Sequence, residues 1–356
     1  MPPLYERVLA FVDDPAAGSF EDLALAVFAH QFDACEPYRR FCLGRARTPA
    51  SVADWRHIPP VPIVAFKSAA LCCGPPLRTF RSSGTTQGEG DRSQHFLPDL
   101  RLYERSALGG LRRFLFPDVE RMRLVSLIPA AADLPDSSLC QMVDWAMARF
   151  AAAGSRCVAA PTGVEIEALI EQLRGSERDG HPLALLTTTG ALIRVLDVLR
   201  ERGLAFRLPH GSRVMDTGGD KGAPRRLSRN GLLHALWGAF AVPGYFCVNE
   251  YGMAELSSQS YDSVIADRLA GRHRPRRLLT PHWLRTRVLD VDTLAPCPPG
   301  ARGVLCHVDL ANAGSAMAVL SEDLGTALDE GFHLLGRAPG AEVRGCSLSA
   351  AQWDAA

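Results

Sequence analysis

Several features that would mark a specialised class of protein are missing from this 356-residue sequence. Lys plus Arg and Asp plus Glu both number 39, so the formal net charge is zero and a role in binding nucleic acid or an anionic membrane is not expected. Residues 1–14 carry charges around a short apolar stretch and no small-residue cleavage site, so we predict no signal peptide. No apolar run reaches the ~18 residues that cross a bilayer. We therefore expect a soluble, cytoplasmic protein without a membrane span.

Clustered cysteines are absent as well. The 10 cysteines form no C-x-x-C pair, and Cys306 beside His307 has no second pair of ligands near it in the sequence. A structural zinc site needs closely spaced ligands and is not expected. Scattered cysteines in a chain of this length fit a reducing compartment, where most of them are expected to be buried as small apolar residues.

The sequence does contain the alternation of strand and helix patterns that is typical of an α/β domain. Ser19 is expected to cap a helix that continues to Phe32, with Asp22 close behind the cap. Further helices are predicted after Gly190 as far as Gly203 and over residues 232–240. Strands are predicted at residues 77–80, 123–128, 183–186, 214–215, 246–248, 283–291 and 303–309. Strands that alternate with helices indicate an α/β sheet flanked by helices.

We divide the sequence into three parts. Residues 1–78 are predicted to form an N-terminal helical region, which ends in proline-rich breaks. Residues 79–340 form the predicted core, and residues 341–356 a short C-terminal remnant that carries Cys346. The basic run at 272–277 has two open interpretations: a solvated loop, or a docking patch for an acidic partner such as a carrier protein.

The first informative segment follows the short strand at 77–80 and reads R-S-S-G-T-T over residues 81–86. Small residues let backbone N–H groups approach a polyphosphate closely, and hydroxyl groups add hydrogen-bond donors. No lysine follows, so this is not the G-x-x-x-x-G-K-[ST] loop. A plain turn remains an alternative for this segment taken alone.

Two further segments lie directly behind predicted strands. Residues 216–222 read D-T-G-G-D-K-G, and adjacent glycines at the end of a strand suit a flat ligand that lies on the backbone. Lys221 is available there as a cation for a phosphate. Residues 249–255 read N-E-Y-G-M-A-E, where Tyr251 can place its ring against an adenine and Glu255 can hold Mg²⁺ beside phosphate oxygens. The alternatives are a tight turn for the first segment, and a core tyrosine with a surface glutamate for the second.

The last two segments are E-D-L-G at 322–325 and L-G-R at 335–337, which runs on to R-G-C at 344–346. An acidic side chain can accept hydrogen bonds from both ribose hydroxyl groups, and an arginine suits phosphate. Each segment is a weak signal by itself.

Taken together and in this order, the five segments resemble the LuxE-type acyl-protein synthetases of the acyl-adenylate-forming (ANL) superfamily. The resemblance runs from about residue 80 to 348, and E-Y-G-M-A-E-L-S-S-Q with R-G-C-S-L points to the LuxE branch. It implies the N-terminal-type domain of adenylate-forming enzymes, an α/β fold with helix-flanked sheets and, here, an N-terminal helical region. It also implies ATP and Mg²⁺ as cofactors and a carboxylic acid as substrate.

The resemblance assigns roles to residues of this sequence. The ATP phosphates would meet the loop formed by Ser82, Ser83, Gly84, Thr85 and Thr86. The adenine would lie among Gly218, Gly219, Asp220, Tyr251 and Gly252. Glu255 would bind Mg²⁺, Asp323 would hold the ribose hydroxyl groups, and Arg337 would reach ribose or phosphate. His95 stands where the family has a histidine after the loop, with either a structural or a functional role.

The sequence departs from the wider superfamily in three places. Gln87 replaces a glycine after the two threonines, and Ala254 replaces a threonine that contacts phosphate. The sequence ends ten residues after Cys346, so the usual C-terminal domain with its catalytic lysine is expected to be missing, as in the LuxE branch. The phosphate charge would then be met by Mg²⁺, Arg337 or Lys221.

The function predicted from the resemblance is ATP-dependent conversion of a carboxylic acid, fatty or another acyl acid, to acyl-AMP, with transfer of the acyl group to a thiol. In the family that thiol is a cysteine near the C-terminus, which passes the acyl group to an acyl-CoA-reductase-type partner, and Cys346 is the cysteine in that position. Two alternatives stay open. One is a ligase that loads coenzyme A or a carrier protein, and the other is a non-catalytic nucleotide-binding subunit.

Overall fold

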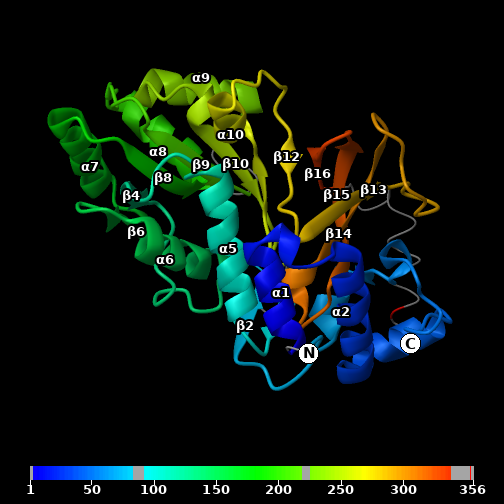
Figure 1. Cartoon of the computed structure of the whole chain (residues 1–356). Coiled ribbons are helices and arrows are strands. Elements are labelled where there is room, and N and C mark those ends of the chain that lie inside the picture. Colours follow the sequence, from blue (N-terminus) through cyan, green and yellow to red (C-terminus); the bar gives the residue numbers. More distant parts are fainter. Residues whose placement is uncertain (1–2, 83–91, 219–224, 338–352, 354–356) are drawn as a thin grey trace. The chain divides into compact units, whose positions relative to one another are not determined.

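The computed structural model describes residues 3–82, 92–218, 225–337 and 353. Contacts between Cα atoms divide the chain into two compact units, whose segments can be followed by colour in Figure 1. The first unit comprises Met1–Gly109, Met253–Ser260 and Arg277–Ala356, and the second comprises Gly110–Gly252 and Tyr261–Arg276. The boundaries predicted at residues 78 and 340 remain predictions.

The first unit opens with helices, as the sequence predicts. They are α1 (Leu4–Asp13), α2 (Phe20–Ala34), α3 (Glu36–Gly44) and α4 (Ala65–Ser68), joined by the 3₁₀ turns η1 (Pro15–Ala17) and η2 (Trp55–His57). The Ser19 side chain accepts a hydrogen bond from the Asp22 backbone at 3.3 Å and caps α2, which confirms the predicted start of this helix.

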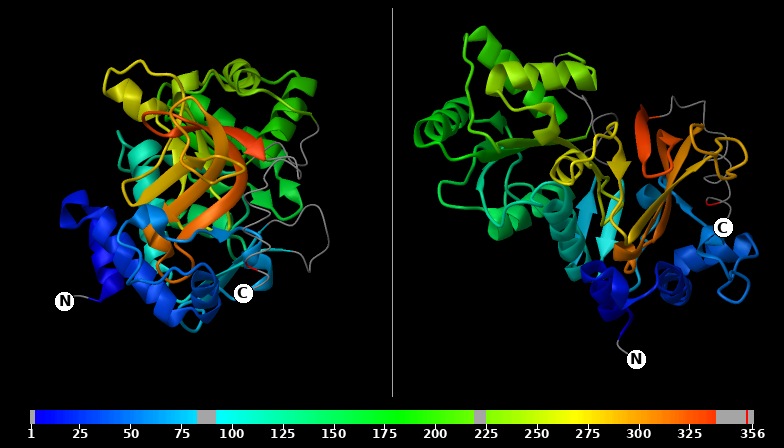
Figure 2. Two further views of the ribbon diagram at one scale, coloured as in Figure 1. Left: turned by 90° about the vertical axis from the view of Figure 1, so that its right-hand side faces the viewer. Right: turned by 45° about the horizontal axis from the view of Figure 1, so that its top comes forward.

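The sheet of the first unit is mainly antiparallel. Its order is β13 (Leu284–Leu289), β14 (Arg302–Asp309), β15 (Ala318–Ala327), β16 (Phe332–Arg337) and β12 (Leu278–Leu279). The short β1 (Val61–Pro62) pairs with β15 in parallel, so the N-terminal region adds a strand to this sheet. Figure 2 shows the long orange strands β14 and β15 side by side, in agreement with their antiparallel register. A separate hairpin consists of β2 (Arg78–Arg81) and β3 (Gln94–Leu97).

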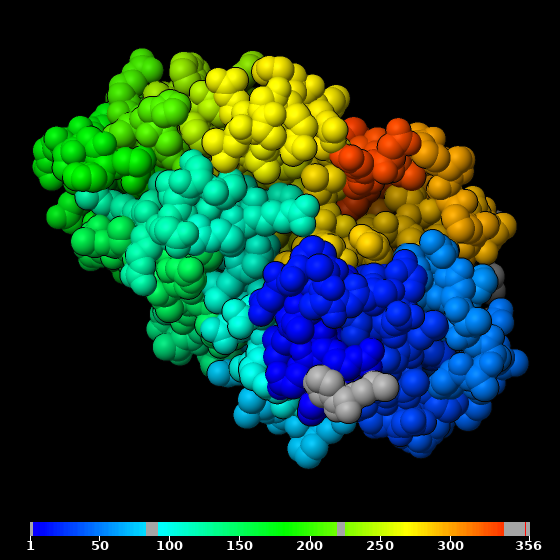
Figure 3. All heavy atoms as spheres, in the orientation of Figure 1, coloured from blue at the N-terminus to red at the C-terminus, as the bar shows by residue number. Residues whose placement is uncertain are grey.

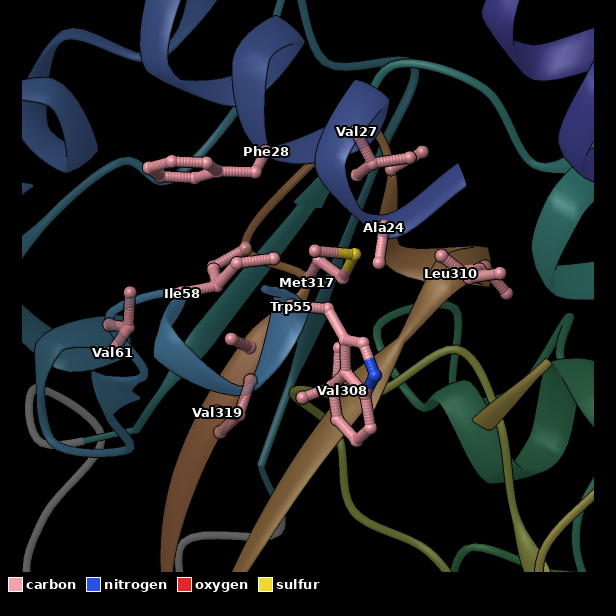
Figure 4. Close-up of a cluster of buried hydrophobic side chains, with 14 of the residues drawn as sticks. Ala24, Val27, Phe28, Trp55, Ile58, Val61, Val308, Leu310, Met317 and Val319 are labelled. Carbon is pink, nitrogen blue, oxygen red and sulfur yellow. The ribbon is translucent and has the colours of Figure 1, made fainter. Parts of the chain in front are cut away.

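One hydrophobic core joins the helices and the sheet of the first unit. Ala24, Val27 and Phe28 of α2 belong to one buried cluster with Leu310 and Met317, which begin and end the connection from β14 to β15, and Ala24 points toward Met317 (Figure 4). Their burial removes apolar area from water, at about 25 cal/mol per Å². In the space-filling view, the blue residues of α1 and α2 form a continuous surface of this unit (Figure 3). The helical region is therefore part of the first unit's core.

The second unit is built on a parallel sheet. Its order is β11 (Ser260–Asp262), β10 (Cys247–Tyr251), β9 (Arg213–Thr217), β8 (Leu183–Thr188), β4 (Arg123–Ser126) and β5 (Arg156–Cys157). The neighbouring strands from β10 to β5 run parallel. A small antiparallel hairpin adds β6 (Ala159–Ala160) and β7 (Gly163–Val164). Strands β8 and β9 are almost wholly buried, which explains the apolar run at residues 183–186 of β8, whereas β9 also buries Arg213 and Asp216.

Helices flank this sheet (Figure 1). They are α6 (Ser138–Phe150), α7 (Ile166–Asp179), α8 (Thr189–Glu201), α9 (Arg229–Phe240) and the shorter α10 (Val264–Leu269), with the 3₁₀ turn η4 (Gly244–Phe246) before β10. The division between the two units falls inside α5 (Arg101–Phe114). Helices that follow parallel strands are the connections such a sheet requires.

The predicted fold class is confirmed, with a mixed α/β architecture and N-terminal helices. The predicted strands appear as β2, β4, β8, β9, β10, β13 and β14, and the predicted later helices as α8 and α9. No helix among the described residues is long and apolar enough to cross a membrane.

Candidate functional site

Glu255 lies in the first unit, in an irregular turn that follows β10 in the chain. Its side chain is 4% exposed, although the sequence allowed a surface glutamate there. Burial raises the pKa of this carboxyl group, while a hydrogen bond from the Ser93 side chain and the charge of Arg337 lower it. The charge of Asp323 raises it further. The structure thus brings three of the predicted site residues, Glu255, Asp323 and Arg337, within electrostatic reach of one another.

Asp323 and Arg337 owe their proximity to strand register. They are opposite partners across the antiparallel pair β15–β16. The Arg337 guanidinium group donates hydrogen bonds to the Glu322 carboxylate, and this contact, followed by the charge of Asp323, raises the pKa of Arg337. The cationic group is therefore held at the end of β16 beside two carboxylates.

Ser82 and Ser93 close the base of the predicted phosphate loop. The Ser93 N–H donates to the Ser82 hydroxyl oxygen at 3.0 Å, and the Ser82 N–H donates to the Ser93 carbonyl oxygen at 3.1 Å. The Ser93 side chain also forms a hydrogen bond with the Glu255 carboxylate. Ser93 therefore contacts both the base of the loop and the candidate metal ligand.

The backbone beside Glu255 is held by two buried side chains. His95 Nδ1 lies 2.8 Å from the Ala254 carbonyl oxygen, so Nδ1 carries the proton, and burial lowers the pKa of His95 to about 4. Asn312 Nδ2 donates to the Glu255 carbonyl oxygen at 2.8 Å. The two consecutive carbonyl groups of the turn are thereby both bonded, which gives His95 a structural role at the site.

Asp309, at the end of β14, anchors the residues that follow Glu255. Its carboxylate accepts from the Ser257 N–H at 3.0 Å and from the Ser258 hydroxyl group at 2.6 Å. The Trp283 indole N–H and the Ser106 hydroxyl group bond to Ser258 in turn. Burial raises the pKa of Asp309 to about 6. The turn with Glu255 is thus fixed from both sides by buried polar contacts.

The second unit places Gly218 at the carboxyl end of β9. Its φ of +73° lies in the left-handed region, and a Cβ atom built on it would meet no atom of the described residues within 4 Å. The Thr189 hydroxyl group lies within hydrogen-bonding distance of the Asp216 carboxylate (3.0 Å) and of the carbonyl oxygens of Thr217 and Gly218. Gly218 thus lies at a strand end and is held from the start of α8, and its part in a backbone platform for a flat ligand remains a prediction.

Two arginines and two aspartates form ion pairs near the carboxyl end of β9. Arg229 bonds to Asp216 at 2.6 Å and approaches Asp262 at 3.5 Å, while Arg276 bonds to Asp262 at 2.6 Å. Burial lowers the pKa of Arg229, but the two carboxylates outweigh it and raise the value overall. The Asn249 side chain bonds to Asp216 as well, so β9 and β10 are tied together where their motifs begin.

Tyr251 and Glu250 end β10. Tyr251 is 8% exposed, so most of its ring is covered. Glu250 is 3% exposed and accepts a hydrogen bond from the Thr217 hydroxyl group. Burial raises the pKa of Glu250 to about 7, while the Thr217 hydrogen bond lowers it and the charge of Asp216 raises it. Gly252 follows as the last residue of this segment of the second unit.

Several predicted site residues lie outside the described residues. They are Ser83, Gly84, Thr85 and Thr86 of the phosphate loop, Gly219, Asp220 and Lys221 behind β9, and Cys346. Their assignments remain predictions.

Some residues that the site needs were not found from the sequence. Ser93, Asp309 and Asn312 contact Glu255 or its neighbours, yet each carries an ordinary polar side chain without a recognisable motif. Asp309 was seen only as the end of a strand. His95 is predicted from the resemblance, whereas Ser93, two residues before it, is the residue that bonds to the Glu255 side chain.

The donors around Glu255 fit a hard cation that also binds phosphate. Mg²⁺ is commonly held by one or two carboxylates together with substrate phosphate oxygens. Glu255 is a buried carboxylate whose pKa is raised by burial, and a cation would relieve the cost of burying its charge. No cluster of three His, Cys, Asp or Glu side chains suited to a metal occurs among the described residues.

Comparisons with known proteins give a family for the chain and similar structures for its fold. A family model of the acyl-protein synthetases, LuxE, matches residues 4–353. A 2-hydroxyisobutyryl-CoA ligase in an open conformation, in complex with 2-HIB-AMP and CoA, superposes with a TM-score of 0.65 at 14% identity, over 89% of this chain and 69% of that chain. The same ligase in its postadenylation state gives 0.64 at 15% identity, over 89% and 67%. A search of curated proteins found no significant match.

Proposed function

Because the chain belongs to the LuxE family of acyl-protein synthetases and is thus an acyl-adenylate-forming enzyme, we propose that it uses ATP to convert a carboxylic acid to acyl-AMP and passes the acyl group to a thiol. The observation that carries the proposal is that Asp323 and Arg337, opposite partners across β15 and β16, lie within electrostatic reach of the buried Glu255 carboxylate. These are the residues that the family resemblance assigns to metal, ribose and phosphate.

In the first half-reaction, a carboxylate oxygen of the acid attacks the α-phosphorus of ATP. The bond from that phosphorus to the β-phosphate oxygen breaks, and pyrophosphate leaves with the electron pair. The attacking group is already an anion, so the enzyme has to align the reactants and neutralise charge rather than remove a proton. The Arg337 guanidinium group is a fixed positive charge that suits this task, and the Glu255 carboxylate would contribute through the Mg²⁺ that it is proposed to hold.

The nucleotide is proposed to be held by the residues that the family resemblance assigns to ribose, phosphate and adenine. Asp323 is proposed to accept hydrogen bonds from the ribose hydroxyl groups, and Arg337 to donate to ribose or phosphate. Gly218 and Gly252 are proposed to line the adenine with Tyr251, and Ser82 is proposed to begin the phosphate loop. The open left-handed geometry of Gly218 supports its part in this proposal.

Mg²⁺ is proposed to be held by Glu255. When bound, it would neutralise negative charge on the phosphates. Ser93 keeps the Glu255 carboxylate oriented by its hydrogen bond, and the buried environment excludes water from it.

In the second half-reaction, a thiolate sulfur attacks the acyl carbonyl carbon, a thioester forms and AMP leaves. We assign the thiol to Cys346. The resemblance supports this assignment, and three of the described cysteines are less suited to the step, because burial raises the pKa of Cys42 and Cys247 to about 12 and that of Cys306 to about 11. A thiolate is the reactive form of cysteine, so these three buried residues are poor acceptors. An acyl-CoA-reductase-type protein would then take the acyl group from Cys346.

Transfer to an external thiol is the second candidate for this step. The similar ligase whose structure contains CoA favours it, and a carrier-protein arm would play the same part. The first half-reaction is common to both candidates. The presence of both Glu255 and Asp323 argues against a non-catalytic nucleotide-binding subunit.

ATP–pyrophosphate exchange tests the proposal. The full chain is incubated with ATP, Mg²⁺, labelled pyrophosphate and one acid from a panel of fatty, aromatic and amino acids. Label is expected in ATP only when a suitable acid is present, and Glu255→Gln is expected to reduce the rate. Absence of exchange with every acid class would contradict acyl-adenylate formation.

A further inference from the structure

We propose that Asn312, supported by Gln31 of the N-terminal helix α2, is a positioning residue that sets the place of the Glu255 carboxylate. The inference rests on the proposed role of Glu255 and adds residues that no sequence motif marks. It follows from a chain of buried contacts within the first unit, from α2 through the connection between β14 and β15 to the turn with Glu255.

Asn312 holds the turn through its amide nitrogen. Nδ2 donates to the Glu255 carbonyl oxygen at 2.8 Å and to the Ala316 carbonyl oxygen at 3.1 Å. Both partners are acceptors, so the amide group is fixed in this orientation, since the flipped form would set its oxygen against two carbonyl oxygens. Asn312 is 0% exposed and lies in the 3₁₀ turn η5 (Leu310–Asn312).

Gln31 fixes the connection that carries Asn312. Its Nε2 donates to the carbonyl oxygens of Asn312 at 2.9 Å and Ala313 at 3.2 Å, and its Oε1 accepts from the Met317 N–H at 3.1 Å. The side chain is fully buried and therefore has little freedom. Apolar packing stabilises the same region, because buried side chains of α2 belong to one hydrophobic cluster with Leu310 and Met317 (Figure 4).

These contacts act on Glu255 in particular. The Asn312 amide bonds to the carbonyl group of Glu255 itself, while Ser93 bonds to the Glu255 carboxylate. The backbone and the side chain of one residue are thus fixed by two different elements. A misplacement of about 1 Å in a reacting group can lower a rate by roughly 100-fold, so a residue that fixes this backbone affects the chemistry without touching a substrate.

The two ends of the Asn312 amide differ in their contacts. Its Oδ1 is buried and has no hydrogen-bond partner among the described residues. A buried acceptor without a partner costs folding free energy. The nitrogen offsets this cost by its two hydrogen bonds, which join the carbonyl groups of Ala316 and Glu255.

The test uses Asn312→Asp and Gln31→Met, both close in shape to the native residues. Asn312→Asp removes the two donated hydrogen bonds, and Gln31→Met removes the three bonds to the connection. The matched control is Ser315→Ala, which lies in the same connection and loses a buried bond to the Leu71 carbonyl oxygen (2.8 Å) instead of a contact to the turn with Glu255. Rates are expressed per folded enzyme, with folding checked by circular dichroism.

The expected result is a fall in kcat for acid-dependent pyrophosphate exchange of roughly 10- to 100-fold in Asn312→Asp, in line with a misplaced reacting group. The Mg²⁺ concentration for half-maximal rate is expected to rise, while KM for ATP stays near its wild-type value. Gln31→Met is expected to change the same quantities in the same direction by less. Ser315→Ala is expected to lose thermal stability with kcat and Mg²⁺ dependence unchanged.

Folded Asn312→Asp and Gln31→Met enzymes with wild-type kcat and Mg²⁺ dependence would overturn the inference. So would failure of both variants to fold, since the contacts would then serve folding alone. The proposed function fails separately, if the wild type shows no exchange with any acid or if Glu255→Gln leaves the rate unchanged. Exchange that needs Glu255 but not Asn312 would refute this inference alone.

Discussion

Replacement of Glu250 by glutamine tests how the buried carboxylates affect stability. Burial raises the pKa of Glu250 from 4.5 to about 7 in the folded protein. Between these values the unfolded chain has released the proton while the folded protein still binds it, so stability falls as pH rises from 4.5 to 7 and is then constant. The difference of 7 − 4.5 = 2.5 pH units corresponds to roughly 3 kcal/mol.

Glu250→Gln has no such proton to release, so its free energy of unfolding should exceed that of the wild type by roughly 3 kcal/mol at pH 8 and by little at pH 4.5. Urea denaturation of both proteins at several pH values measures this difference. The contributions of all other titrating groups cancel in this difference, because both proteins contain the same groups. A difference that is constant from pH 4.5 to 8, or a variant less stable at pH 8, would refute the reasoning.

Three further variants test individual residues. Asp323→Ala is expected to weaken ATP binding at least about tenfold, because charge-assisted hydrogen bonds contribute roughly 1.5–3 kcal/mol; unchanged affinity in calorimetry would remove Asp323 from the site. Gly218→Ala is expected to cost about 1–2 kcal/mol because its φ is +73°, and a wild-type urea midpoint would contradict this. Cys346→Ala is expected to keep pyrophosphate exchange and lose hydroxylamine-sensitive labelling by radiolabelled acid, so surviving label would assign the acceptor to another thiol.

Local patterns in the sequence predicted much of the fold. The α2 start at Ser19 depends on a side chain and a backbone N–H three residues apart, so the sequence pattern contains it. The buried strand β8 is visible in the sequence as the apolar run at residues 183–186, and β9 is marked by Val214 and Met215 before the glycines. The strand predicted from Phe246 begins at Cys247 instead, because Phe246 closes the 3₁₀ turn η4.

Long-range contacts could not be predicted in this way. Gln31 and Asn312 are 281 residues apart in the chain, and nothing near either one indicates the other. Likewise, Asp323 and Arg337 were proposed separately, and only the register of β15 and β16 makes them opposite partners. The motifs predict which residues carry chemistry, whereas the polar contacts that hold Glu255 depend on tertiary structure.

The most direct test of the central claim follows oxygen atoms through the reaction. The substrate acid is supplied with both carboxylate oxygens as ¹⁸O, together with ATP, Mg²⁺ and a thiol acceptor, and the products are examined by mass spectrometry. Attack of the carboxylate on the α-phosphorus predicts AMP that carries one ¹⁸O atom and pyrophosphate that carries none. Label in inorganic phosphate with release of ADP, or unlabelled AMP beside the thioester product, would contradict an acyl-adenylate intermediate.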